Sequence, residues 1–169
     1  SSGRAGGKGS WDIYRSIFVD KHYTEPENLG NSINTQFRDW DPFVALDESY
    51  LIFASTRPGG YGGGDLYISF RNEKGSWTEA KNLGHKINSV DTEYCPNVSP
   101  DGKFFFFTRF GGGSQQFYSE VQRTYDEVIK IFNDPENGLG NIYWVNTRFI
   151  NELKFDSGNK KNLENKAQY

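Results

Sequence analysis

The sequence predicts an all-β fold, a β-propeller built from four-stranded antiparallel blades of about 53 residues, with one inserted amphipathic helix. Three observations predict it. A block of sequence repeats along the chain, short aromatic and β-branched segments alternate with turns inside each copy, and a single stretch in the last copy has helical periodicity.

The repetition is extensive and ordered. Residues 2–14, a glycine-rich segment that ends in Trp-Asp-Ile-Tyr, return without a gap as residues 55–67. Residues 28–30, Asn-Leu-Gly, return 54 positions later as residues 82–84. A third glycine turn lies at 109–112, and the strand after it is delayed by an insertion. Self-similarity with a period of this size is typical of propellers and related repeat architectures.

Each copy contains short segments that favour strands. Residues 50–54 and 104–107 are aromatic and β-branched runs bounded by turns, and residues 65–70 follow the glycine-rich turn. Such side chains pack well on a pleated, half-buried surface. With a final strand near Trp77, one period holds about four short strands, which is the content of a propeller blade.

These patterns divide the chain into a propeller segment, 1–154, and a polar tail, 155–169. The segment comprises a partial blade 1–38, a blade 39–92 and a third blade 93–154. About two and a half blades are therefore expected, whereas closed propellers typically have four to eight. We expect either a longer polypeptide or self-association of copies to complete the ring.

The third blade carries the insertion. Between residues 114 and 132 the apolar residues recur three, four and seven positions apart, and Asn133-Asp134-Pro135 ends the pattern. We expect this amphipathic helix between the second and third strands of the last blade. Its apolar face would pack on its own propeller or dock a partner domain.

Composition excludes several classes of protein. Aromatic residues make up 17% of the chain, which argues against a disordered segment. The net charge of −3 argues against a nucleic-acid surface. No apolar run approaches the roughly 20 residues of a membrane span. The single cysteine cannot form an internal disulfide, which leaves the redox compartment open.

Charged residues that recur in every copy are expected to serve the fold. Arg4, Arg57 and Arg109 recur, as do the acids Asp39 and Glu93. Arginine–carboxylate pairs between neighbouring blades account for this recurrence. A ring of charge that binds an anion or a metal is the alternative.

Catalytic arrangements are sparse. The two histidines are His22 and His85, and no Gly-x-Ser-x-Gly elbow is present. Cys95, at the mouth of a strand, is expected to act as a small hydrophobic residue. We therefore predict no catalytic residue, metal or cofactor. Glycoside cleavage by Asp39 and Glu93 stays open, because spacing in the sequence does not give their separation.

Residues that break the repeat are better candidates for ligand binding. Trp40 and Tyr61 lie near turns, where aromatic rings stack on sugars or anchor peptides. His85 lies in a turn where the previous copy has asparagine. We predict a ligand site from these three residues, with Arg57 and Arg109 as supporting charges.

Three segments resemble the TolB-type WD-like β-propeller repeat family. They are residues 93–103, Glu-Tyr-Cys-Pro-Asn-Val-Ser-Pro-Asp-Gly-Lys; residues 107–109, Phe-Thr-Arg; and residues 63–67, Gly-Gly-Asp-Leu-Tyr. The resemblance covers roughly residues 1–150, apart from the insertion. It implies a propeller on the bacterial envelope side, periplasmic or extracellular. In the family such propellers are often joined to a peptidoglycan-binding or carbohydrate-active domain, and most act as binding scaffolds.

Together these features predict a non-catalytic binding module of a bacterial envelope or secreted protein. Its loops would present the site to a peptide, glycan or protein partner, with no nucleic acid and no membrane span. The alternative is the propeller part of a glycan-active enzyme or of a propeller-gated serine peptidase.

Overall fold

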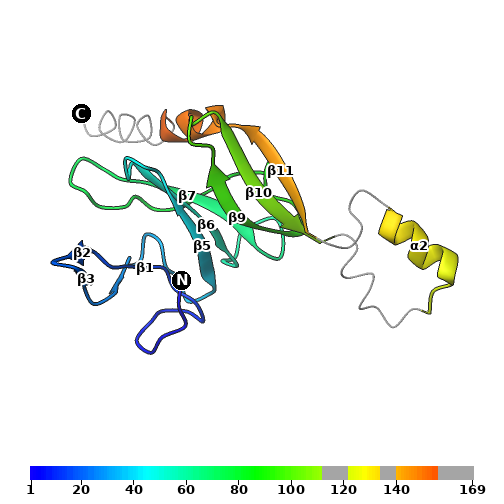
Figure 1. Cartoon of the computed structure of the whole chain (residues 1–169), viewed down its shortest axis with the longest axis horizontal. Coiled ribbons are helices and arrows are strands. Elements are labelled where there is room, and N and C mark those ends of the chain that lie inside the picture. Colours follow the sequence, from blue (N-terminus) through cyan, green and yellow to red (C-terminus); the bar gives the residue numbers. More distant parts are fainter. Residues whose placement is uncertain (112–121, 134–139, 156–169) are drawn as a thin grey trace, which may run out of the picture.

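The computed structural model describes residues 1–111, 122–133 and 140–155, and within them the fold is mostly β (Figure 1). The strands are β1 (Tyr14–Arg15), β2 (Phe18–Val19), β3 (His22–Tyr23), β4 (Glu27–Asn28), β5 (Asp39–Val44), β6 (Tyr50–Ser55), β7 (Asp65–Phe70), β8 (Lys81–Asn82), β9 (Thr92–Val98), β10 (Phe104–Phe110) and β11 (Asn141–Asn146). The helix α2 spans Tyr125–Asn133, and residues 148–155 are also helical.

The largest sheet has four antiparallel strands in the order β5-β6-β7-β8, and it lies within residues 39–92. The outer strand of this sheet is not the one that the sequence predicted near Trp77. The strand is Lys81–Asn82, whereas Trp77 forms only an isolated bridge with Arg71. Arg71 and Trp77 flank a turn in which the Gly75 N–H donates to the Asn72 carbonyl. The Trp77 ring packs against the core.

The next sheet has three antiparallel strands, β9, β10 and β11, and it repeats the register of the first. Phe53 pairs with Tyr67 between β6 and β7, and Phe107 pairs with Tyr143 between β10 and β11. In both sheets the first strand pair shifts register at a bulge. The two sheets therefore share strand order and register, and we call residues 39–92 the second unit and residues 93–154 the third unit.

The four-stranded sheet is buried on both faces, and this explains why β6 and β7 carry apolar residues at successive positions, such as Leu51–Ala54 and Leu66–Ile68, instead of alternating with exposed polar ones. One face packs on the three-stranded sheet, through the residues Ile52, Ala54, Leu66, Ile68, Phe70, Phe105 and Phe107. The other face packs on the first unit, residues 1–38, through Leu51, Phe53, Tyr67, Ile13 and Ile33.

The inserted helix lies between the second and third strands of its unit, as expected, and ends at Asn133. Its start differs from the prediction of 114–132, because α2 begins at Tyr125. Thr124 and Glu127 form a capping box there: the Thr124 N–H donates to the Glu127 carboxylate at 2.7 Å, and the Glu127 N–H to Thr124 Oγ1 at 3.4 Å. Residues 112–121 lie outside the described residues.

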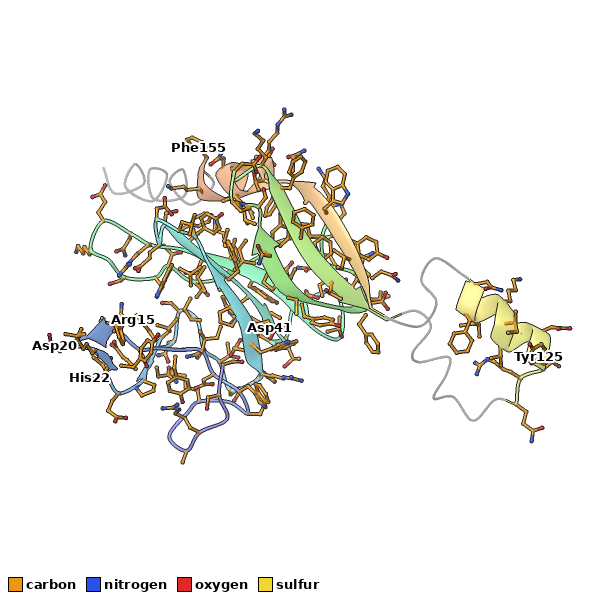
Figure 2. All side chains as sticks on the ribbon, in the orientation of Figure 1. Arg15, Asp20, His22, Asp41, Tyr125 and Phe155 are labelled. Carbon is orange, nitrogen blue, oxygen red and sulfur yellow. The ribbon has the colours of Figure 1, made fainter. Side chains whose placement is uncertain are left out.

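The described part of α2 does not pack on the sheets. None of its side chains is buried, and Tyr125 is 77% exposed (Figure 2). The helical residues 148–155, which the sequence did not predict, do pack: Ile150 is 7% exposed and joins the core between the two sheets. Of the predicted tail 155–169, only Phe155 lies in the described residues.

Candidate functional site

The loops that carry the candidate residues lie at one edge of the sheets. Successive strands run antiparallel, so every second connection lies at the same edge. The connections 56–64 and 83–91 share this edge with the chain that leaves β10 toward α2. Tyr61 and His85 are therefore neighbours in space, although they lie on different loops.

A buried aspartate organises the glycine-rich loop that carries Tyr61. The main-chain N–H groups of Tyr61 and Gly62 donate to the Asp65 carboxylate at 2.7 and 3.2 Å. The Asn82 side-chain amide donates to the same carboxylate at 2.6 Å. Because the loop folds around a carboxylate of its own chain, it is a structured hairpin connection.

The same network occurs in the first unit. There the N–H groups of Lys8 and Gly9 donate to Asp12 at 2.6 and 3.1 Å, and Asn28 donates at 2.7 Å. Sequence analysis did not assign this role to Asp12 and Asp65. The recurrence of aspartate at these two positions, 53 residues apart, was the feature of the sequence that could have indicated this role.

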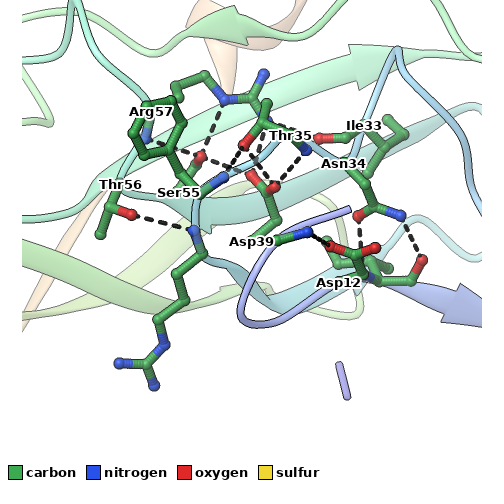
Figure 3. Close-up of polar contacts among 12 residues, drawn as sticks. Asp12, Ile33, Asn34, Thr35, Asp39, Ser55, Thr56 and Arg57 are labelled. Carbon is green, nitrogen blue, oxygen red and sulfur yellow. Dashed lines mark hydrogen bonds and ion pairs between the residues drawn. The ribbon is translucent and has the colours of Figure 1, made fainter. Parts of the chain in front are cut away.

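Asn88 fixes the second loop, the one that carries His85. Its side-chain oxygen accepts the Leu66 N–H at 2.8 Å, and its amide donates to the Leu66 carbonyl at 2.9 Å. The first unit repeats this with Asn34 and Ile13 at 2.8 and 2.9 Å (Figure 3). Both loops are thus attached to the start of β7.

Arg57 and Arg109 each pair with a buried carboxylate and also hydrogen-bond to a carbonyl of the preceding unit. Arg57 donates to the Asp39 carboxylate at 2.8 Å and to the Ile33 carbonyl, which belongs to the preceding unit, at 2.6 Å (Figure 3). Arg109 donates to Glu93 at 2.8 Å and to the carbonyl of residue 87 at 3.0 Å. Arg57 and Arg109 form the predicted pairs with Asp39 and Glu93, but the prediction that such pairs connect neighbouring blades is wrong, because each pair lies within one unit. The tie between units comes from the carbonyl.

These ion pairs occupy the charged groups that a ligand would otherwise bind. The Asp39 and Glu93 side chains are completely buried, and each accepts an arginine and a hydroxyl hydrogen bond. Arg57 and Arg109 also stack over the rings of Tyr67 and residue 143. Since both carboxylates are engaged, they are poorly placed for the two-carboxylate chemistry of glycoside cleavage.

Trp40 is a core residue. It is 6% exposed, and its ring lies so close to Gly64 that a Cβ there would come within 2.7 Å of the indole. Arg38 lies over the Trp40 ring, with its guanidinium carbon 4.6 Å from the ring centroid. Because its ring is covered, Trp40 has no exposed face on which a ligand could stack.

Tyr61 and His85 are both exposed, and their ring centroids lie 6.5 Å apart. Tyr61 is 49% exposed, and Val90, on the adjoining loop, is 83% exposed. The first unit has lysine and asparagine at the positions of Tyr61 and His85, so it lacks this pair. We call Tyr61, His85 and Val90 the rim patch.

Other reactive groups do not assemble into a site. Among residues 1–111, 122–133 and 140–155, no cluster of three histidine, cysteine or acidic side chains is placed to hold a metal. The exposed Cys95 thiol lies 3.4 Å from the Asp41 carboxylate. Partial burial, and then that carboxylate, raise the pKa of the Cys95 thiol, so the reactive thiolate is disfavoured.

Comparison with known proteins adds no identification: no family model, curated protein or solved structure matches this chain. Within the described residues, neither helical segment has the length and apolar character of a membrane span.

Proposed function

We propose that this chain is a non-catalytic binding module that uses the rim patch to hold a peptide, glycan or protein partner. The observation that carries the proposal is the pairing of two exposed, non-repeating rings on two separately anchored loops. Exposed aromatic rings on a rigid scaffold bind partners with a small loss of conformational entropy. A tyrosine face stacks on a sugar or a peptide group, and the imidazole beside it exchanges hydrogen bonds.

We further propose that the module is a segment of a β-propeller of the TolB type from a periplasmic or extracellular protein. Two features support this proposal. The second and third units share strand order and register, and they pack face to face. Stacked antiparallel sheets of about four strands are the repeating element of propellers.

An array of glycans and peptides, probed with the unaltered chain and two variants, tests the function. We expect Tyr61→Ala combined with His85→Ala to weaken binding by about 1–2 kcal/mol, roughly five- to thirty-fold, because it removes both rings. Tyr23→Ala is the matched control, since Tyr23 is 71% exposed on the β2–β3 hairpin. Equal loss in both variants, or no captured ligand, would contradict the proposal.

A further inference from the structure

The helix α2 carries an apolar face that the sheets do not cover. Tyr125, Val128 and Ile129 are three and four positions apart, which places them on one side of the helix. Tyr125 is 77% exposed and Ile129 is 38% exposed. Lys130 lies on the opposite side. Figure 1 shows α2 beyond the ends of β10 and β11, at the edge of the sheets that carries the rim patch.

The segment that contains α2 leaves the sheet directly beside the rim patch. Phe110 ends β10 and pairs with Thr92 of β9. Gly111 lies so close to Asp91, the residue that follows the rim patch, that a Cβ there would overlap the Asp91 carboxylate. The Gly63 N–H donates to the Asp91 carbonyl at 2.8 Å, which holds the other loop of the rim patch at the same residue. Both loops of the rim patch therefore meet the start of the inserted segment.

The inserted segment returns to the same edge. A Cβ at Gly140, the residue before β11, would lie 3.0 Å from Thr108 Cγ2 and 3.1 Å from the Tyr94 hydroxyl, so the chain enters β11 in contact with β9 and β10. Seven residue steps join Asn133, the last residue of α2, to Gly140. An extended chain spans at most roughly 3.6 Å per residue, so the end of α2 lies within about 25 Å of this edge.

The rim patch and the helix face are complementary in chemistry. Tyr61 is 49% exposed and Val90 is 83% exposed, and these residues present apolar groups. Lys86, next to His85, is exposed, and the exposed Asp126 flanks the apolar face of α2. Burial of apolar surface favours contact between the two, and opposite charges at the edge favour one orientation. Because both surfaces belong to one chain, the contact costs less translational freedom than the association of two molecules does.

We propose that α2 closes over the rim patch of its own chain, with Tyr125 and Ile129 against Tyr61 and Val90. The arrangement in Figure 1 is then the open state, in which the rim patch is exposed. In the closed state α2 occupies the place of a ligand, so a partner binds only the open state and shifts the population toward it. This regulatory role rests on the proposed function of the rim patch, whereas closure itself does not.

Disulfide trapping tests the contact without any ligand. Cys95→Ser removes the single native thiol, and Val90→Cys is combined with Ile129→Cys in that background. A disulfide requires Cα atoms within about 7 Å of each other, so mild oxidation of the dilute protein links this pair only if α2 reaches the rim patch. The matched control combines Val90→Cys with Lys130→Cys, on the opposite side of the same helix. We expect its disulfide to form at least ten-fold more slowly.

The two histidines provide a second measurement on the chain that keeps Cys95. Ile129→Gln should shift the imidazole NMR signals of His85, because a polar amide on the apolar face disfavours closure. Lys130→Gln is the matched control and should leave these signals in place, since glutamine is a good helix former at both positions. His22, on the β2–β3 hairpin, is the internal reference and should not shift in either variant.

A rapid disulfide between positions 90 and 129 within one chain, together with shifted His85 signals in Ile129→Gln, would support the proposal. Equal rates for the two cysteine pairs, a disulfide formed only between two chains, or unshifted His85 signals in Ile129→Gln would overturn it. If a cysteine variant does not fold, the His85 signals decide. Since neither measurement uses a ligand, an array that captures nothing would contradict the proposed function and leave closure standing.

Discussion

Asp39 and Glu93 place full negative charges in the interior, where a charge is costly unless it is paired. Each is paired with an arginine whose second hydrogen bond reaches the carbonyl of the preceding unit. The exposed pair between Arg15 and Glu27, at the same 2.8 Å distance, lies in water and contributes little. The buried ion pairs therefore matter more for stability than the exposed pair does, although the nitrogen–oxygen distance is the same in all of them.

Arg57→Ala should lower the free energy of unfolding by about 3–5 kcal/mol, because it leaves the Asp39 carboxylate buried without its partner. Arg15→Ala should cost about 0–1 kcal/mol, since the side chains of Arg15 and Glu27 are 43% and 67% exposed. Urea denaturation followed by tryptophan fluorescence measures both. Equal losses would show that the buried pair stabilises the fold no more than the exposed pair does.

Among the elements, α2 depends on local interactions more than any strand does. It has acidic residues in its first turn, Lys130 in its last turn and the Thr124–Glu127 box at its start. Acidic residues near the start and basic residues near the end of a helix stabilise it through the helix dipole. Since none of its described side chains is buried, we expect its stability to depend little on the sheets.

Thr124→Ala should lower the stability of α2 by about 1 kcal/mol, because the cap loses its hydroxyl. We expect the backbone chemical shifts of α2 to move toward coil values, while the melting temperature of the sheets stays unchanged. Gln122→Ala, outside the cap, is the control. A lower melting temperature in Thr124→Ala would instead place α2 against the sheets.

Across the whole molecule, the sheets differ in what covers them. Leu66 and Ile68 of the four-stranded sheet are completely buried by the third unit. Their counterparts on the three-stranded sheet, Ile142 and Trp144, are 75% and 61% exposed. Exposed apolar sheet faces favour association. Association of copies, or a longer chain that completes the ring, stays a prediction.

Light scattering should therefore show a dimer or a larger species, and Trp144→Lys should shift the mass toward the monomer. Leu46→Lys is the control: Leu46 is 95% exposed, but it lies in the connection between β5 and β6, away from that face. A monomer with a sharp melting transition would contradict the expectation of association.

The sequence alone determined the features that repeat. Copies 53 and 54 residues apart predicted the strands of the second and third units, their glycine-rich connections and the arginine–carboxylate pairs. These features follow from local residue preferences and from recurrence, both of which are visible in a linear pattern.

Only the tertiary structure decided which side chains are buried and which loops meet. Trp40 and Tyr61 both appear as aromatic residues near turns, yet packing against Gly64 buries the first while the second stays exposed beside His85. The outer strand at residues 81–82 and the buried Ile150 likewise depend on contacts between distant segments. Burial is set by the surface of the neighbouring unit, and a linear pattern does not contain that surface.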